Sequence, residues 1–268
     1  MRRSTGQGSL TRSLRTAGFV LALGALSLSA APAHAAARLP CGAELTVDTT
    51  LTEDLVCPDA GNGLVVRGDG VVLDLAGHRI VGGGSSGVLV QGRDVVVRGG
   101  TVTAFGEGIS VWGGASATVE RVTLLRNITG IDSDGEAVLR DSQVRANSRG
   151  VLAEGDGVVS VEGSDLARNP TAVSAYDGGD VRITDSTVRS NQRALDCDAG
   201  TLHVRRSVVL DSGTAVRVNG CAGSSVAGSL FVHNDVQVVD PALATRQIAF
   251  SCTRFLDGRS APAAVPCP

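Results

Sequence analysis

Short runs in which apolar and polar residues alternate fill most of this chain. Val159-Ser160-Val161 and Val181-Arg182-Ile183 are two clear examples, and each is followed by a polar turn. Alternation with a period of two is typical of a strand that buries one face. No stretch with the longer period of an amphipathic helix competes with it. The pattern therefore predicts a protein made of many short strands.

A second pattern repeats on top of the first: an Asn, two free positions, a small residue and a branched apolar residue. Successive copies begin 20, 22, 22 and 21 residues apart, which is too regular for loops and too short for pairs of helices. This spacing predicts a solenoid. The motif begins at Asn127, Asn147, Asn169, Asn191 and, with Ser in place of Asn, at Ser212.

Units that contain only strands and tight turns must stack in parallel, each strand bonded to its equivalent one coil away. The sequence therefore predicts an all-β fold, a single-stranded parallel β-helix of about eight to nine coils. A leucine-rich repeat is the competing solenoid, because Leu166-Ala167-Arg168-Asn169 resembles its Leu-x-x-Asn element, but its other leucines are missing. The expected coils begin near Gly63, Gly87, Gly108, Gly130, Gly150, Ala172, Ala194, Ala215 and Gln237.

The repeated Asn is expected to occupy a sharp bend between strands. Asn tolerates left-handed backbone conformations, and its amide can bond to the equivalent Asn one coil away. Asn127-Ile128-Thr129 also has the form of a glycosylation acceptor. We favour the structural ladder over the glycosylation site.

The first 35 residues have the features of a secretory signal peptide. Four Arg precede an apolar stretch, and Ala33-His34-Ala35 offers a cleavage site between small residues. We therefore expect a secreted, extracellular protein with a signal peptide at 1–35, an N-terminal cap at 36–62, the β-helix at 63–258 and a tail at 259–268.

Charge limits the partners of the mature protein. The whole chain has a net charge of −3, so removing four Arg and no acid leaves −7. An acidic protein is a poor candidate for nucleic acid binding. The chain contains no Lys, so no amine is available as a base. We expect a monomer with no nucleic acid partner and no membrane association after the signal is removed.

Six Cys lie in the predicted mature part, an even number that favours disulfides in an oxidising compartment. Six Cys allow 15 pairings. The β-helix geometry favours one of them, in which two bonds hold the end caps and one joins neighbouring coils. The favoured pairs are Cys41 with Cys57, Cys197 with Cys221, and Cys252 with Cys267.

One segment resembles a known family. Leu73-Asp-Leu-Ala-Gly-His-Arg-Ile80 is similar to the first coil of secreted bacterial right-handed parallel β-helix proteins in the pectate-lyase-like superfamily. Cys41-Gly42 and Leu51-Thr-Glu-Asp-Leu-Val-Cys57-Pro resemble the cap before that coil. The resemblance implies a right-handed helix over nearly all of the mature chain. It does not choose among the lyases, galacturonases, epimerases and other proteins of this fold.

The catalytic motifs of those enzymes are missing. The chain has no Gly-His-Gly and no Arg-Ile-Lys of a galacturonase, no second Arg beside Arg168 as in a pectate lyase, and no Asp-Pro-His of an epimerase. His78 lies in the family-like segment. The alternation predicts that it points inward, so we expect a core residue rather than a catalytic one.

The outward side of the strand that opens each coil is the candidate ligand face. Alternate side chains point to opposite faces, so the fifth position of each coil points outward and the third position adds Asp132, Asp196 and Arg217 to the same face. The only Trp and the only Tyr of the chain both fall in the fifth-position column. That column contains Arg67, Gln91, Trp112, Asp134, Glu154, Tyr176, Asp198 and Asn219.

Stacked coils lie about 4.8 Å apart, so Trp112 and Tyr176 are expected about 14 Å apart with carboxylates between them. Aromatic rings and acids together suit a polysaccharide. Neighbouring carboxylates repel, which either raises one pKa toward acid catalysis, with Asp134 and Glu154 as candidates, or recruits a cation such as calcium. The ligand-binding candidates are Trp112, Asp132, Asp134, Glu154, Tyr176, Asp196, Asp198 and Asn219.

Three hypotheses follow. The favoured one is a secreted β-helix that binds polysaccharide or another extracellular ligand without chemistry. The second is a polysaccharide lyase, epimerase or hydrolase with a divergent carboxylate site on the same face. The third is a structural surface spacer.

Four arginines form a stripe near the Asn turn: Arg126, Arg145, Arg168 and Arg189. We interpret this stripe as a solubilising edge rather than as a binding site for an anionic polymer.

Overall fold

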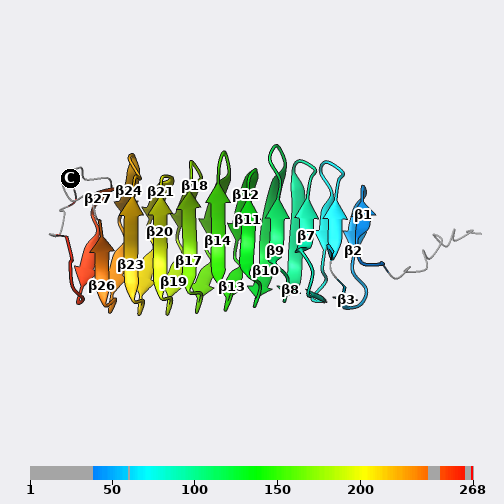
Figure 1. Ribbon diagram of the computed structural model, residues 1–268, viewed down its shortest axis with the longest axis horizontal. Coiled ribbons are helices and arrows are strands. Elements are labelled where there is room, and N and C mark those ends of the chain that lie inside the picture. The colour runs from blue at the N-terminus through cyan, green and yellow to red at the C-terminus, as the bar shows by residue number, and fades with distance from the viewer. Residues whose placement is uncertain (1–38, 60, 241–247, 263–266, 268) are drawn as a thin grey trace, which may run out of the picture. The chain divides into compact units, whose positions relative to one another are not determined.

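The computed structural model describes residues 39–59, 61–240, 248–262 and 267. This part of the chain contains 28 strands and no helix. The strands stack coil upon coil in the order of the sequence (Figure 1), in a parallel β-solenoid of about nine turns. The predicted all-β architecture is confirmed. The predicted signal peptide lies outside the described residues.

Each coil contributes strands to three parallel rows. Sheet A contains ten strands, and its broad face is turned toward the viewer in Figure 1. Its strands are β1 (Ala43–Leu45), β4 (Leu64–Val66), β7 (Ser86–Val90), β9 (Glu107–Val111), β11 (Thr129–Ser133), β14 (Arg149–Glu154), β17 (Thr171–Tyr176), β20 (Arg193–Asp198), β23 (Thr214–Asn219) and β26 (Val236–Val239).

The other two rows, here called B and C, close each coil. The long strands β8 and β10 belong to both rows, because each continues through the corner between them. Row B contains β2 (Thr49–Thr50), β5 (Val72–Asp74), β8 (Val95–Thr103), β10 (Ser116–Leu125), β12 (Glu136–Arg140), β15 (Val158–Glu162), β18 (Asp180–Thr184), β21 (Thr201–Arg205), β24 (Ser224–Ala227) and β27 (Ile248–Ser251). Row C adds β3 (Leu55–Cys57), β6 (Arg79–Gly82), β13 (Gln143–Arg145), β16 (Asp165–Ala167), β19 (Thr187–Arg189), β22 (Val208–Leu210), β25 (Leu230–Val232) and β28 (Arg254–Leu256).

Inward side chains of all three rows meet in one core that runs the length of the solenoid. Val151 of β14, for example, pairs in register with Ile131 and Val173 on the neighbouring coils, and all three are fully buried. Burying a side chain of this size contributes about 1.5–3 kcal/mol. Each coil therefore extends the core by the same few aliphatic residues, which explains why Val, Leu and Ile recur at fixed places in the repeat.

The Asn ladder is present and buried. The amide nitrogen of Asn147 donates to Oδ1 of Asn169 at 3.2 Å and to the carbonyl of Leu124 at 3.0 Å, and the backbone N–H of Asn147 also donates to Oδ1 of Asn169. Asn127 is held in the same way, so its amide nitrogen is engaged inside the coil, as expected for a ladder rather than a glycosylation site.

One detail of the predicted bend is wrong. The left-handed backbone conformation belongs to the residue before each Asn, such as Arg126 (φ 56°) and Arg168 (φ 58°), and not to the Asn itself. The preceding residue makes the turn and projects into solvent, which directs the Asn side chain into the core. The ladder and the turn are therefore neighbouring positions.

A second ladder, which the sequence analysis did not anticipate, occupies the corner between rows B and C. The hydroxyl of Ser164 accepts the backbone N–H of Ser142 at 3.1 Å and donates to the carbonyl of Glu162 at 2.8 Å. Ser186 and Ser207 repeat the arrangement on the following coils. Both corners thus satisfy buried backbone groups with short polar side chains.

All three favoured disulfides are present: Cys41–Cys57, Cys197–Cys221 and Cys252–Cys267. The first and last lie near the two ends of the solenoid, and the second joins adjacent coils. Parallel pairing already begins at β1, β2 and β3, so residues assigned to the cap carry strands of all three rows. No helix in the described residues is long and apolar enough to cross a lipid bilayer.

Candidate functional site

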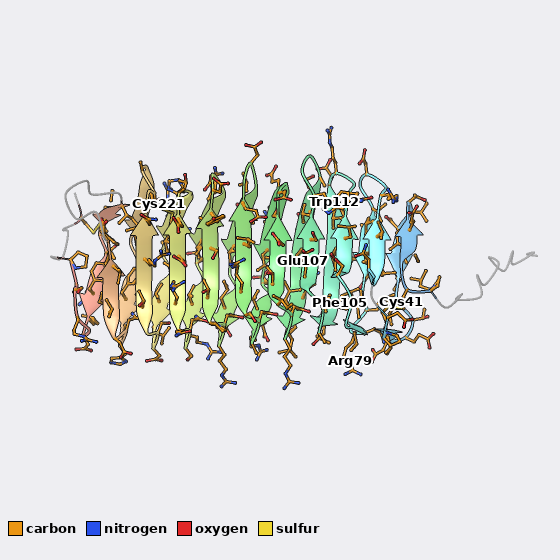
Figure 2. The ribbon with its side chains drawn as sticks, viewed as in Figure 1. Cys41, Arg79, Phe105, Glu107, Trp112 and Cys221 are labelled. Carbon is orange, nitrogen blue, oxygen red and sulfur yellow. A yellow bond between two sulfur atoms is a disulfide. The ribbon has the colours of Figure 1, made fainter. Side chains whose placement is uncertain are left out.

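The outer face of sheet A presents three columns of side chains. Trp112 and Tyr176 belong to one column, because they follow Val111 and Ala175, which share a ladder position through β11 and β14. Both residues are 51% exposed. Figure 2 shows Trp112 near the upper end of this face, with Glu107 lower on the same strand region. The two aromatic residues are therefore on one side, three coils apart.

The predicted residues divide into two groups along this face. Asp132, Asp134 and Glu154 surround a depression of about 260 Å³ beside Trp112. Asp196 and Asp198 line a second depression of about 330 Å³ beside Tyr176. Glu154 lines both depressions, so they adjoin. Asn219 lies one coil beyond Asp198 and donates to its carboxylate at 2.8 Å.

The depression beside Trp112 is acidic. Asp132 lies in the central column, between Ser110 and Leu152 on the adjacent strands. Burial, assisted by the carboxylates of Glu107, Glu154 and Asp134, raises the pKa of Asp132 to about 7, while Arg149 opposes the shift. A carboxyl group with this pKa is partly protonated near neutral pH and can donate a hydrogen bond or a proton.

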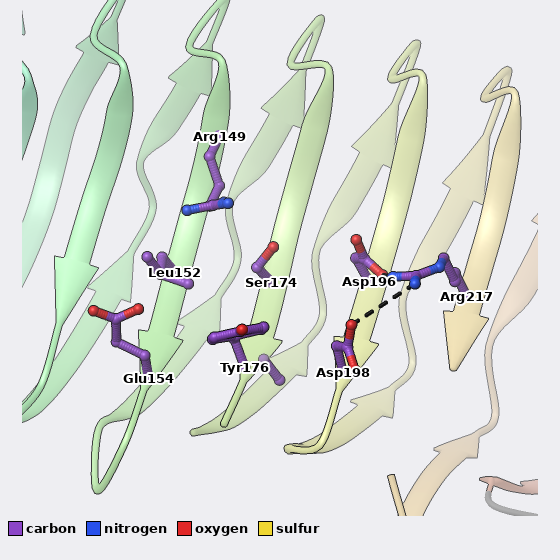
Figure 3. A pocket seen from close by; sticks show the side chains of 9 residues that line it. Arg149, Leu152, Glu154, Ser174, Tyr176, Asp196, Asp198 and Arg217 are labelled. Carbon is purple, nitrogen blue, oxygen red and sulfur yellow. Dashed lines mark hydrogen bonds and ion pairs between the residues drawn. The ribbon is translucent and has the colours of Figure 1, made fainter. Parts of the chain in front are cut away.

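The depression beside Tyr176 has a different character, because its two aspartates are paired with arginines. The carboxylate of Asp196 accepts from Arg193 at 2.6 Å and from Arg217 at 2.8 Å. Arg217 also reaches Asp198 at 3.7 Å (Figure 3). These contacts neutralise most of the local negative charge and fix the side chains that surround the exposed ring.

Arg149 and Glu107 belong to the site although the sequence analysis did not select them. Arg149 lines the depression of Tyr176 and extends over the face above Leu152 (Figure 3). Glu107 lines the depression of Trp112 and accepts from the hydroxyl of Ser86 at 2.8 Å. Both lie one position before the small residue that was taken as the start of each coil. Strict alternation from the outward third position reaches that small residue and assigns its predecessor to the inward side, so the period of two could not have found them.

In the described part of the chain, no group of three or more His, Cys, Asp or Glu side chains is placed to hold a metal ion. Asp134 and Glu154, the predicted catalytic pair, lie on adjacent coils in the column of Trp112 and Tyr176. Asp132 lies beside this pair, and burial together with the neighbouring carboxylates raises its pKa.

His78 is not the core residue that the alternation predicted. A third of its side chain is exposed, and its Nδ1 lies 3.6 Å from Oδ1 of Asp54. The turn at Ala76 and Gly77, both with positive φ, shifts the chain at this corner and turns the imidazole toward the Asp54–Arg79 pair. His78 therefore belongs to a surface polar cluster on rows B and C, away from sheet A.

Comparison with known proteins identifies the fold. The family model for a right handed beta helix region matches residues 62–240. The crystal structure of the pectate lyase Pel9A is similar, with a TM-score of 0.54 and 16% sequence identity over 84% of this chain and 67% of that one. No curated protein matches the sequence. At this identity the likeness concerns the fold alone, and the match over most of the solenoid places the chain in the right-handed β-helix family.

Proposed function

We propose that this protein is secreted and binds a polysaccharide along the outer face of sheet A, between Trp112 and Tyr176. The observation that carries the proposal is the alignment of two exposed aromatic rings in one column, separated by two coils that present hydrogen-bonding carboxylates. Similarity in fold to a pectate lyase agrees with a carbohydrate ligand. The three disulfides agree with an oxidising, extracellular compartment.

The spacing of the site suits an extended chain of sugars. Three steps of about 4.8 Å separate the two rings by about 14 Å, so one ring contacts each end of a short oligosaccharide. Aromatic faces pack against the apolar side of pyranose rings, while Glu154 between them accepts hydrogen bonds from hydroxyl groups. Two shallow, adjoining depressions beside the rings give room for such a chain without enclosing it.

Retention on a panel of immobilised polysaccharides tests the proposal. Trp112→Ala and Tyr176→Ala are each expected to lower affinity about tenfold, because a stacked aromatic ring contributes about 1 kcal/mol or more. Ile128→Ala is the matched control, since Ile128 is 65% exposed but lies at the Asn corner, off the face. Equal retention of the double variant and the control would refute the proposed site.

The raised pKa of Asp132 favours a second candidate, cleavage of the bound chain. Asp132 is the candidate general acid, with Glu154 or Asp134 as the second carboxylate. New reducing ends or unsaturated uronates, produced by the wild type and lost in Asp132→Asn, would support an enzyme. The same assay with added calcium and with a chelator tests a cation requirement. Binding without any cleavage across the panel would leave the binding role alone.

A further inference from the structure

The Asn corner forms an edge of the solenoid at the foot of sheet A, where its strands begin (Figure 1). The residue before each ladder position has positive φ and points into solvent on eight consecutive coils, from Ala104 to Asp257. Backbone hydrogen bonds keep these residues in register, as from the N–H of Ala146 to the carbonyl of Ala167 and from that of Arg168 to Arg189. We call this column the Asn edge. In order it contains Ala104, Arg126, Ala146, Arg168, Ser190, Asp211, His233 and Asp257.

Charge is divided unevenly along the Asn edge. Its first half carries Arg126 and Arg168, and its second half carries Asp211 and Asp257. None of the described carboxylates lies within ion-pair distance of the two arginines, whereas nearby Arg189 and Arg193 are both paired. The two aspartates share a single imidazole, that of His233, at 3.6 and 3.4 Å. Both halves therefore keep charge available for a partner.

The order of these charges is complementary to itself. When the edge is laid antiparallel against a copy of itself with Ser190 at the centre, Arg168 faces Asp211 and Arg126 faces Asp257. Ala146 then faces His233, and Ala104 lies beyond the paired positions. A two-fold axis produces each of these contacts twice, which is the rule for an interface between identical chains.

We propose that two copies of this chain associate through their Asn edges in an antiparallel, two-fold symmetric pair. A polyanion is a poorer fit, because a long anionic chain that followed the arginines would meet Asp211 and Asp257 within a few coils. The flanking positions agree with the pairing. Leu125, which precedes Arg126, is placed opposite the exposed Leu256, which precedes Asp257.

The size of the edge makes the association weak. Six steps of about 4.8 Å give a contact about 29 Å long, and a strip about 10 Å wide buries about 600 Å² in total, which is in the range of transient contacts. Surface ion pairs are screened by salt, so the pair should form at low ionic strength and high protein concentration. The two-fold axis keeps both sheet A faces on the same side of the pair.

Charge reversal gives a sharp test, because each substitution installs a type of residue that the same column already carries on another coil. Variant one is Arg126→Asp with Arg168→Asp, and variant two is Asp211→Arg with Asp257→Arg. Sedimentation at about 0.02 M NaCl should show wild-type self-association that disappears at about 0.5 M. Each variant alone should associate at least about tenfold more weakly, because all four contacts become repulsive.

An equimolar mixture of the two variants should form a heterodimer, because every contact again joins opposite charges. The quadruple variant with both sets of changes should regain self-association. A wild type that stays monomeric at every concentration at low salt would overturn the proposal. Variants that associate as well as the wild type would do the same. A monomeric wild type that binds a heparin column through Arg126 and Arg168 would replace the proposal with a polyanion contact.

Discussion

Replacing Asp132 with Asn tests the electrostatics of the outer face directly. The pKa of Asp132 is about 7 in the folded chain and 3.8 in the absence of its neighbours, so the folded protein binds the proton more tightly. The proton therefore stabilises the folded state below pH 4, and this contribution is lost as the pH rises toward 7. Above pH 7 the buried carboxylate destabilises the fold. The amide of the Asp132→Asn variant would keep the shape of the side chain and carry no charge at any pH.

The magnitude follows from the two pKa values. The difference between about 7 and 3.8, at about 1.4 kcal/mol per pKa unit, sets an upper limit of about 4 kcal/mol. Part of the Asp132 side chain remains in contact with solvent, so screening reduces the expected effect to about 1–2 kcal/mol. Asp132→Asn should therefore be more stable than the wild type by about 1–2 kcal/mol at pH 8 and nearly equal to it at pH 4.

Urea unfolding of both proteins between pH 4 and 8 measures this difference, and carbon NMR of the labelled carboxyl group gives the titration midpoint. Arg149→Ala is an informative companion, because it removes the cation that opposes the shift and should raise the midpoint above 7. The reasoning fails if the wild type and Asp132→Asn show parallel stability profiles over this range. It also fails if the carboxyl group titrates near 4.

Two further predictions concern the scaffold. Asn169→Ala removes the acceptor of the Asn147 backbone N–H and the donor to the Val144 carbonyl, so we expect a loss of about 2–4 kcal/mol in urea unfolding. Asn169→Ser should lose less than half as much, because Ser already serves as the acceptor at the equivalent position two coils later; equal losses would contradict the ladder argument. Replacing Cys197 and Cys221 together with Ala opens a bridge between residues 24 apart and should cost about 3 kcal/mol, and unchanged stability under non-reducing conditions would count against the bridge.

The scaffold was predictable because two sequence periods determine it. Alternation determines which side chains point inward. The recurring Asn aligns each coil with its neighbours at one fixed position, even though the coils differ in length. Asn147, for example, is bonded one coil forward and one coil back. The same reasoning misplaced the left-handed residue by one position, because both Asn and its predecessor are compatible with a bend. Sequence alone did not reveal that the Asn would be buried and its predecessor exposed.

The chemistry of the outer face was less predictable, for a reason that lies in the fold itself. Inward positions must fit a common core, but each outward residue is free to vary and acquires its properties from neighbours on adjacent coils. The pKa of Asp132 depends on Glu107, which is 25 residues earlier, and on Glu154, which is 22 residues later. Asp196 was predicted as a ligand-binding acid, yet Arg193 and Arg217 occupy both of its oxygens. Whether an outward acid is available to a ligand therefore depends on the side chains of its own coil and of the coils on either side. Residues at equivalent positions of neighbouring coils must be considered together, as well as residues that follow one another in the sequence.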